Sequence, residues 1–84
     1  MRLDKYLKVS RLIKRRTVAN EAATNEKILV NNNLAKPSKD IKIGDLITII
    51  YTNKKVTVRV TSLEIQIKKE NASLMYEFVE EINN

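Results

Sequence analysis

At residues 14–23 the chain reads Lys14-Arg15-Arg16-Thr17-Val18-Ala19-Asn20-Glu21-Ala22-Ala23. Val18, Ala19, Ala22 and Ala23 recur at helical spacing, so this basic run stands at the start of a helix. Helix N-termini prefer acidic or short polar residues, and each cation placed there costs about 0.3–1 kcal/mol. Free backbone N–H groups and guanidinium groups together suit a phosphate. The stretch therefore predicts a phosphate-binding helix start, and the simpler alternative is a solvated basic surface.

The basic charge of the chain is concentrated near residue 1. The 84 residues include 16 Lys and Arg against 10 Asp and Glu, a net charge of +6. Residues 1–20 hold seven basic residues and a single acid, Asp4, and so account for the whole net charge. Residues 68–84 hold two basic and four acidic residues. Charge segregated in this way predicts a polyanionic partner for one face of the molecule.

Residue types that the chain lacks exclude several classes of function. It contains no Cys and no His, which excludes disulfides, zinc sites built on those residues and imidazole catalysis. Residues 1–20 contain no apolar segment of a secretory signal, and no apolar run approaches the ~20 residues of a membrane span. The length suits one small domain. We therefore expect a monomeric cytoplasmic protein with no metal, no cofactor and no membrane partner.

Two short helices are predicted in the first third of the chain. In residues 3–9, Leu3 and Leu7 share one face, and basic residues spaced by three form a stripe beside them. Residues 15–25 form the second helix, and Asn25 is expected to end it in the left-handed conformation. Tyr6 lies beside the two leucines, so we expect it in the core, with stacking on a base as the minority alternative.

The rest of the chain predicts strands followed by a third helix. Strands are expected at 28–30, 34–35, 46–51 and 56–61, with turns at 31–33 and 43–45 and a loop at 36–40. Ile65 and Ile67 are expected to extend the last strand. Apolar residues at helical spacing over 70–82 predict an amphipathic C-terminal helix. The fold class is therefore α+β, with two N-terminal helices packed on a small, mainly antiparallel sheet and a helix at the C-terminus.

Motifs that follow one another in order identify a resemblance. They are Met1-Arg2-Leu3-Asp4-Lys5-Tyr6-Leu7, Arg11, Arg16-Thr17-Val18-Ala19, Ile28-Leu29-Val30-Asn31, Lys36-Pro37-Ser38 and Ile41-Lys42-Ile43-Gly44-Asp45. This set resembles the S4 RNA-binding domain, whose core would cover about residues 1–50. The extension over about 51–84, with Ala72-Ser73-Leu74-Met75-Tyr76-Glu77, is similar to single-domain S4 proteins that bind the free large ribosomal subunit. Among these, the ribosome-associated heat-shock protein and its short RqcP-type relatives, the spacing of the first 16 residues favours the RqcP type.

The resemblance implies a fold and a function. The fold would be the S4-like RNA-binding fold, also called αL, as a single domain over residues 1–84. The function would be recognition of a stalled large subunit that still holds peptidyl-tRNA, in support of C-terminal alanine tailing of the nascent chain. The implied partners are 23S rRNA, peptidyl-tRNA and an alanine-tailing factor on the same subunit. A general rescue or heat-shock role on the large subunit is the alternative.

The chain departs from the family pattern at two turns and at the start of the second helix. The glycine that usually precedes the first strand is missing from Asn25-Glu26-Lys27, and the usual Asn-Gly after that strand is Asn31-Asn32. Arg15 stands where a Ser or Thr commonly caps the second helix. These differences bear on loop geometry rather than on function.

The candidate RNA-binding residues are mostly cations of the first helix and the basic run. Arginine suits bidentate phosphate contacts and stacking on bases, and Arg16 matches the family arginine that opens the second helix. Asp4 either orients Arg2 or a neighbouring lysine, or only pairs locally. No acid lies near Arg16 in the sequence, so Arg16→Glu is expected to leave the fold intact. The full set is Arg2, Asp4, Lys5, Lys8, Arg11, Lys14, Arg15, Arg16, Thr17 and Lys36.

Two other classes of function are weaker. A basic module for protein or membrane surfaces would need large apolar anchors on the basic face, and the first helix uses its own for the core. An enzyme would need a constellation of reactive groups, whereas the carboxylates Glu64, Glu70 and Glu77 are scattered. We therefore expect no catalytic residues and a non-enzymatic RNA-binding factor.

Overall fold

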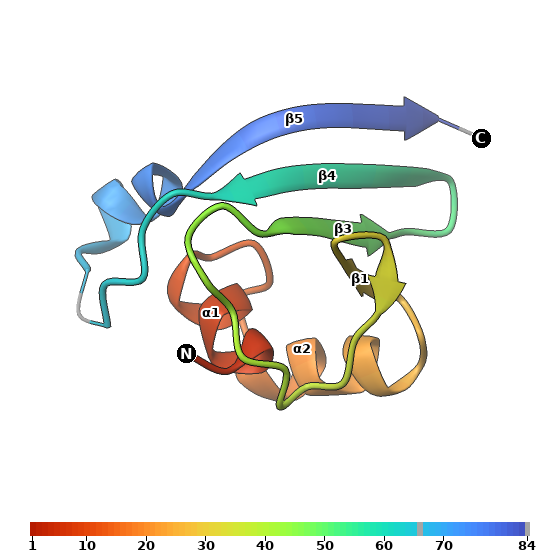
Figure 1. Ribbon diagram of the computed structural model, residues 1–84. Coiled ribbons are helices and arrows are strands. Elements are labelled where there is room, and N and C mark those ends of the chain that lie inside the picture. Colours follow the sequence, from red (N-terminus) through yellow and green to blue (C-terminus); the bar gives the residue numbers. More distant parts are fainter. Residues whose placement is uncertain (66, 84) are drawn as a thin grey trace.

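Two α-helices cover one face of a five-stranded antiparallel sheet (Figure 1). The computed structural model describes residues 1–65 and 67–83. The helices are α1 (Leu3–Val9) and α2 (Arg16–Thr24). The strands lie in the order β2-β1-β3-β4-β5, with bounds β1 (Ile28–Val30), β2 (Asn33–Leu34), β3 (Leu46–Ile50), β4 (Lys54–Val60) and β5 (Tyr76–Asn83). A 3-10 helix, η1 (Lys69–Met75), precedes β5.

The α+β architecture predicted from the sequence is confirmed, as are both N-terminal helices and the antiparallel sheet. Leu3, Tyr6 and Leu7 are fully buried on the inner face of α1. Ala19 and Ala23, four residues apart, are the buried positions of α2, and these small side chains let the helix lie close to its neighbours. Each helix therefore turns one narrow apolar stripe inward, and Asp4 of α1 is the one charged residue of the two helices that is buried.

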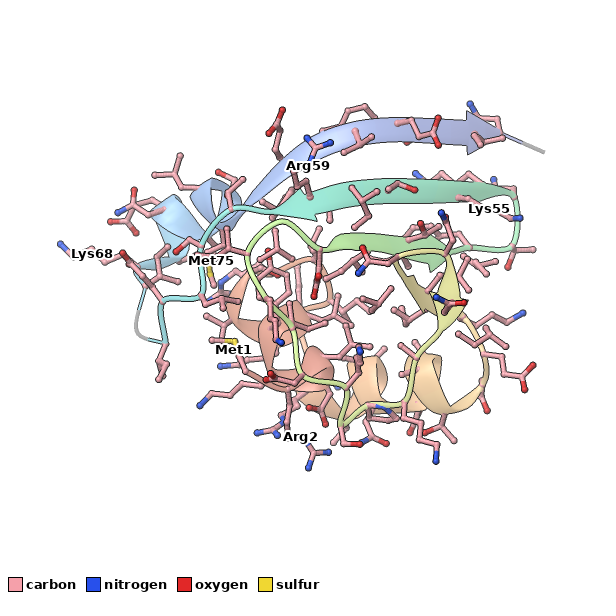
Figure 2. The ribbon with its side chains drawn as sticks, viewed as in Figure 1. Met1, Arg2, Lys55, Arg59, Lys68 and Met75 are labelled. Carbon is pink, nitrogen blue, oxygen red and sulfur yellow. The ribbon has the colours of Figure 1, made fainter. Side chains whose placement is uncertain are left out.

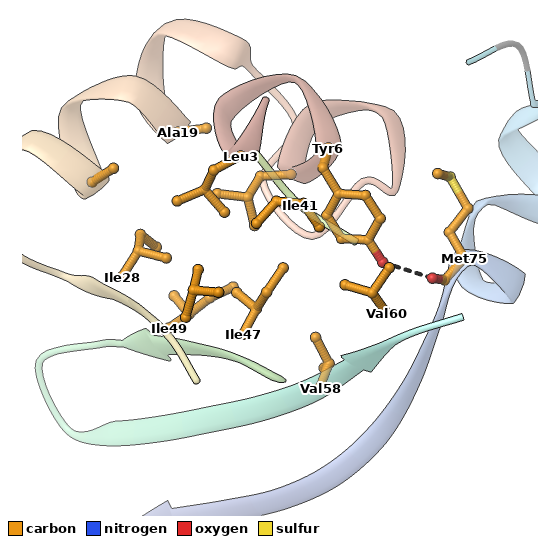
Figure 3. Packing of buried hydrophobic residues seen from close by; sticks show 13 residues of the cluster. Leu3, Tyr6, Ala19, Ile28, Ile41, Ile47, Ile49, Val58, Val60 and Met75 are labelled. Atoms are coloured by element: carbon orange, nitrogen blue, oxygen red, sulfur yellow. Dashed lines mark hydrogen bonds between the residues drawn. The ribbon is translucent and has the colours of Figure 1, made fainter. Parts of the chain in front are cut away.

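The core lies between the helices and the inner face of the sheet (Figure 3). Ile47 on β3 pairs with Val58 on β4, and both are buried because successive strand residues alternate between the two faces. On the opposite face, Thr48 and Thr57 pair and their hydroxyl oxygens lie 2.8 Å apart in a hydrogen bond. The buried hydrophobic cluster comprises Leu3, Tyr6, Leu7, Ala19, Ala23, Ile28, Val30, Ile41, Ile47, Ile49, Val58, Val60 and Met75.

The loop between β2 and β3 holds the start of α1 in place. Arg2 is the N-cap of α1 and forms no side-chain capping bond. Instead, the backbone N–H groups of Leu3 and Asp4 donate to the carbonyls of Lys39 and Pro37, at 2.8 and 3.1 Å. The Met1 ammonium also lies 2.9 Å from a carboxylate oxygen of Asp40. The first turn of α1 is thus fixed by a segment more than thirty residues away, which determines where its side chains point.

Glu26, and not Asn25, takes the left-handed conformation at the end of α2. The prediction for Asn25 is wrong, since its φ is −87°, whereas Glu26 has φ 61°. The N–H of Glu26 donates to the Ala23 carbonyl and that of Lys27 to the Ala22 carbonyl, the pattern of a Schellman motif. Glycine is the usual residue at this position, so Glu26 stands where the family glycine is missing and carries some backbone strain.

The turn between β1 and β2 uses two asparagines in place of Asn-Gly. Asn31 and Asn32 have φ of 51° and 68°, as a two-residue type I′ hairpin turn requires. Asparagine tolerates this region better than most residues, so the turn forms without glycine. The return strand begins at Asn33 rather than at Leu34 as predicted.

The C-terminal helix predicted for 70–82 is wrong over most of its length. Residues 69–75 form η1, and Tyr76 begins β5, which pairs with β4 along its whole length. The register shifts at a bulge opposite Thr57 and Val58. The prediction that Ile65 and Ile67 extend the preceding strand is also wrong, because β4 ends at Val60. The chain leaves the sheet there, turns through η1 and returns as the edge strand.

Tyr6 joins α1 to this C-terminal segment. Its hydroxyl donates a 2.6 Å hydrogen bond to the backbone carbonyl of Met75, and both residues are fully buried (Figure 3). Burial, with Tyr76 nearby, raises the pKa of Tyr6, so the phenol remains a donor. The expectation that Tyr6 belongs to the core is confirmed, and a buried ring is not available to stack on a base.

Candidate nucleic-acid interface

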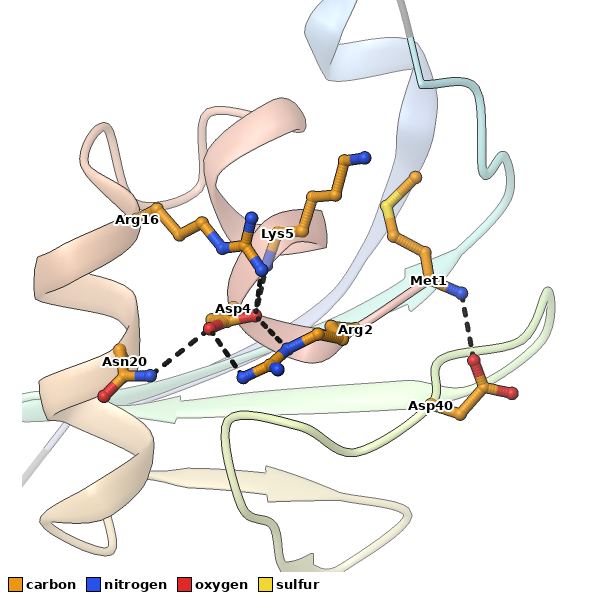
Figure 4. A network of polar contacts seen from close by, with 7 residues as sticks. All are labelled: Met1, Arg2, Asp4, Lys5, Arg16, Asn20 and Asp40. Atoms are coloured by element: carbon orange, nitrogen blue, oxygen red, sulfur yellow. Dashed lines mark hydrogen bonds and ion pairs between the residues drawn. The ribbon is translucent and has the colours of Figure 1, made fainter.

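A buried carboxylate holds two arginines at the surface where α1 and α2 meet. Asp4, in the first turn of α1, accepts hydrogen bonds from Arg2 Nε and Nη2, at 3.2 and 3.3 Å. Arg16 Nη2, from the first turn of α2, lies 3.4 Å from the same carboxylate, and Asn20 Nδ2 lies 3.3 Å from it (Figure 4). We call Arg2, Asp4, Arg16 and Asn20 the Asp4 cluster.

Burial and hydrogen bonding act in opposite directions on the acid of this cluster. Burial alone raises the pKa of Asp4, but hydrogen bonds from Asn20, Arg2 and Arg16, with the charge of Arg16, outweigh it and hold that pKa below its ordinary value. Asp4 is therefore ionised at neutral pH. It also accepts a 2.8 Å bond from the backbone N–H of Lys5.

The two interpretations of Asp4 left open by the sequence are thus resolved. Asp4 does more than pair locally, because it holds an arginine from each helix. Its contact with Lys5 is made through the backbone and not through the lysine ammonium. The side chain is only 3% exposed, whereas those of Arg2 and Arg16 are 52% and 48% exposed. The buried carboxylate thus holds the two more exposed guanidinium groups in position.

The arginines retain donors for a ligand. A guanidinium carries five N–H donors in a fixed plane, and the carboxylate takes two from Arg2 and one from Arg16. One negative charge offsets only one of the two positive charges. The ion pairs with Asp4 hold both guanidinium groups in position, and with them the remaining N–H donors. This arrangement suits bidentate recognition of phosphate.

Three shallow hollows surround the Asp4 cluster and share its residues. One of about 440 Å³ is lined by three cations and an apolar wall: Met1, Arg2, Lys5, Arg16, Leu63 and Ile65. A second, of about 390 Å³, lies over α2 at Asp4, Arg16, Thr17, Asn20 and Glu21. The third, of about 560 Å³, is a groove between α2 and the loop that follows β2, and Arg2, Asn20, Lys36 and Pro37 are among its lining residues. Arg2, Arg16 and Asn20 therefore join one continuous hollowed surface.

The sequence-predicted site residues fall into two groups. Arg2, Asp4, Lys5, Arg16, Thr17 and Lys36 come together in or around the three hollows. Lys8, Arg11, Lys14 and Arg15 line none of these hollows; Lys8 lies exposed in the last turn of α1, and the other three lie exposed on the segment that connects α1 to α2. Arg11 has φ 63°, and its N–H donates to the Lys8 carbonyl, so a tight turn presents it to solvent.

The expectation that Arg16 has no acidic neighbour is wrong. Asp4 is 12 positions away in the sequence but lies against the Arg16 guanidinium, because α1 and α2 pack together. A glutamate at position 16 would face a buried carboxylate. Arg15, by contrast, is the N-cap of α2 with no side-chain capping bond, as the missing Ser or Thr suggested.

Asn20 is the member of the cluster that sequence reasoning missed. It lies one turn after Arg16 and reaches Asp4 across the helix pair. An asparagine inside a short helix gives no chemical signal by itself, and only the packing of α2 on α1 gives it a role.

Two other kinds of site find no support in the described ranges, 1–65 and 67–83. In those ranges no three His, Cys, Asp or Glu side chains gather as they would around a metal ion. No helix there is long and apolar enough to cross a membrane.

Comparison with known proteins places this surface in context. Residues 1–47 match the protein family described as the S4 domain. Over 81 residues the chain is 53% identical to the proteins named RQC P-site tRNA stabilizing factor of Streptococcus pneumoniae and Bacillus subtilis, covering 96% of this chain and 92% and 94% of theirs. The fold is similar to that of heat shock protein 15 from Vibrio cholerae, whose structure is trimeric, with a TM-score of 0.86 and 30% identity. That match covers 94% of this chain and 81% of the other.

Proposed function

We propose, since the chain belongs to the S4 domain family and to its RQC P-site tRNA stabilizing factors, that it binds tRNA and ribosomal RNA in ribosome-associated quality control. RNA binding would be carried by the Asp4 cluster and the cations around it. The relatives' name places their tRNA in the P site, and we extend that role to this chain. A ribosome-bound role would place the protein in the cytoplasm.

The observation that carries this proposal is the Asp4 cluster itself. A nearly buried carboxylate holds two half-exposed guanidinium groups from different helices, with Lys5 lining the same hollow as both of them. Such fixed donors favour an ordered array of phosphates over diffuse anion attraction. Lys8, Arg11, Lys14 and Arg15 would widen the basic surface, and Thr17 and Lys36 would contact RNA along α2 and the loop after β2.

The finer part of the proposal concerns partners on the ribosome. The contacted RNA would be 23S rRNA of a large subunit that still holds peptidyl-tRNA. The protein would support C-terminal alanine tailing beside a separate tailing factor, as a monomer and without chemistry of its own. Residues 1–50 would form the RNA-binding core, and the remaining segment, which supplies β4 and β5, would complete the same single domain.

A second candidate role rests on the structural likeness to heat shock protein 15. A general rescue factor of that kind would also bind the large subunit through a basic surface. The two roles differ in outcome within the cell. Deleting the gene would remove alanine tails from stalled nascent chains only if the first proposal is correct, and mass spectrometry of a stalled reporter would detect them.

Salt dependence tests the RNA-binding proposal on the purified protein. If about six cations meet phosphates, log K for large subunits should fall with log salt at a slope of about −4 to −5. Arg11→Ala should reduce this slope by about 1, as one phosphate contact is lost. Lys55→Ala, on the exposed part of β4, removes the same charge from a surface remote from the cluster and serves as the control.

The result that would contradict the proposal is equally clear. Salt-insensitive sedimentation with ribosomal RNA would mean that phosphates are not the ligand. Equal effects of Arg11→Ala and Lys55→Ala would mean that net charge alone attracts the RNA. Preference for anionic vesicles over RNA at equal charge would favour a membrane-surface module.

A further inference from the structure

Strand β5 is an edge of the sheet with an unusual surface. It runs from Tyr76 to Asn83 and, within the described residues, pairs with β4 on one side only, so its other side presents backbone donors and acceptors to solvent. Phe78, Val79 and Ile82 on this strand are 60%, 38% and 51% exposed. A long edge with three exposed apolar side chains is a template for another strand.

The same edge is acidic. Glu77, Glu80 and Glu81 are all exposed on β5. Glu77 is paired with Arg59 of β4 at 3.5 Å and Glu81 with Lys54 at 3.8 Å. Glu80 lies opposite Thr57 and forms no ion pair within the described residues. The bulge divides the strand into two parts, and each part carries at least one glutamate and one exposed apolar side chain.

Protection against aggregation does not by itself explain the glutamates on this edge. Proteins blunt an edge by keeping it short, by placing charged residues on it or by a bulge, and β5 has both charged residues and a bulge. Here the strand has eight residues and keeps its apolar side chains exposed beside the acids. A surface that combines free backbone groups, apolar contacts and one sign of charge has the properties of a selective binding site.

The glutamates also determine which kind of partner can bind to β5. Glu80, which forms no ion pair within the described residues, would repel RNA, whereas Glu77 and Glu81 are partly offset by Arg59 and Lys54. A second copy pairing antiparallel about Val79 would place Glu77 of one chain opposite Glu81 of the other, and like charges directly opposite destabilise a sheet. An extended polypeptide with basic side chains would instead meet opposite charges across the new strand pair. Charge complementarity therefore favours a basic partner segment.

We propose that β5 is a docking edge for an extended basic polypeptide segment, which adds a sixth strand to the sheet. This interaction goes beyond RNA binding and uses a different surface. The Asp4 cluster lies beneath the sheet in the region of Arg2, whereas β5 runs along the opposite side of the molecule, beyond Arg59 (Figures 1 and 2). RNA and a basic protein segment can thus be held together, one on each side.

Two peptides of opposite charge test this assignment on the intact protein. The probe is an eight-residue peptide of alternating lysine and valine, as long as β5, and its counterpart has glutamate in place of lysine. Because the protein carries a net charge of +6, nonspecific attraction would favour the glutamate peptide. We expect the lysine peptide to shift and protect the backbone amides of β5 in NMR spectra. The glutamate peptide should shift only residues around the Asp4 cluster, which makes it an internal control for the basic face.

Substitution of Glu80 supplies the matched variants. Glu80→Lys should weaken lysine-peptide binding about threefold to tenfold, the effect of turning a cross-strand charge pair into a like-charge pair. Glu80→Gln should weaken it less. Glu64→Lys makes the same charge change at an exposed position between β4 and η1 and should leave lysine-peptide binding unchanged. Since Glu80 is exposed and forms no ion pair within the described ranges, the variants should melt like the wild type.

Three results would overturn the proposal. Failure of the lysine peptide to bind would contradict a docking site on β5, and equal weakening by Glu80→Lys and Glu64→Lys would mean that the peptide binds elsewhere. Self-association through β5, seen by sedimentation as a dimer that Glu80→Lys alters, would make a second copy the occupant. None of these results tests the salt-dependent binding of RNA, so either proposal can be wrong while the other is correct.

Discussion

The carboxylate of Asp4 and the guanidinium of Arg16 lie 3.4 Å apart, although they belong to different helices. The same carboxylate binds Arg2, so one acid determines the positions of the two cations. RNA-binding surfaces are often described as patches of charge, but in the interface that we propose a negative group organises the positive ones. The consequence can be measured. Removing the acid makes the protein more basic, which favours RNA binding, but it also releases the two arginines, which weakens binding.

Asp4→Asn should weaken binding to the large subunit although it makes the protein more basic. The amide keeps the shape of the side chain but loses the charge that holds Arg2 and Arg16. Its loss should also lower the free energy of unfolding by about 1–3 kcal/mol, since hydrogen bonds to a charged group are replaced by poorer ones. Co-sedimentation at a temperature where the variant is folded separates the two effects. Tighter binding by the variant would mean that Asp4 does not hold Arg2 and Arg16 in position for RNA.

The stability difference between wild type and Asp4→Asn should depend on pH. The folded-state pKa of Asp4 is lowered below its ordinary value of 3.8, so the ionised form stabilises the fold. This contribution is fully present above pH 3.8 and is lost as the pH falls through the lowered folded-state pKa. Urea unfolding of both proteins from pH 7 downward should therefore give curves that are separated at neutral pH and converge in acid. A constant separation down to the lowest pH would mean that the charge of Asp4 does not stabilise the fold.

Arg16→Glu and Arg15→Glu should have opposite effects on stability. Glutamate at position 16 would face the Asp4 carboxylate, and we expect a loss of about 1 kcal/mol for this half-exposed pair. Glutamate at position 15 would meet the positive end of α2 without an acidic neighbour, and should add about 0.3–1 kcal/mol. Thermal melting of the two variants checks this. Arg16→Glu should also cost about 2 kcal/mol of ribosome binding, as a charge-assisted phosphate contact is lost. Similar melting of both variants would show that the Asp4–Arg16 pair contributes little in solution.

Tyr6→Phe should destabilise the fold without affecting RNA contacts. It removes the hydroxyl that donates to the Met75 carbonyl and leaves that carbonyl buried without this partner, at a cost of about 1–3 kcal/mol. Tyr51→Phe, at a position that is 41% exposed, is the control and should change stability by less than about 0.5 kcal/mol. Chemical denaturation measures both. Loss of ribosome binding by fully folded Tyr6→Phe protein would mean that the hydroxyl, and not only the stability it supplies, matters for RNA binding.

Local pattern predicted much of this fold. The spacing of Leu3 and Leu7 located α1, and the alternation of Val56, Val58 and Val60 located β4. Strand β5 was missed for a physical reason. The bulge inserts an extra residue, so Phe78, Val79 and Ile82 no longer alternate with period two and instead imitate the three-and-four spacing of a helix.

The candidate site was predicted in part for similar reasons. Segregated charge and the motif resemblance were enough to indicate Arg2, Asp4 and Arg16. The contacts of Asp4 with Arg16 and Asn20 could not be read from the sequence, because they depend on how α1 packs against α2. The left-handed residue after α2 was assigned to Asn25 on propensity, while the Schellman hydrogen bonds place it at Glu26.

The bond between Tyr6 and Met75 has a consequence for biosynthesis. The chain is made from residue 1 onward, so the phenol of Tyr6 is synthesised long before the Met75 carbonyl that accepts its hydrogen bond. Met75 is itself part of the buried cluster, and the core beneath α1 remains open until it arrives. Contacts so distant in sequence form late, because the closure entropy of the intervening chain must be overcome first. A nascent chain interrupted before residue 75 would therefore lack the contact with Met75 that completes the core beneath α1.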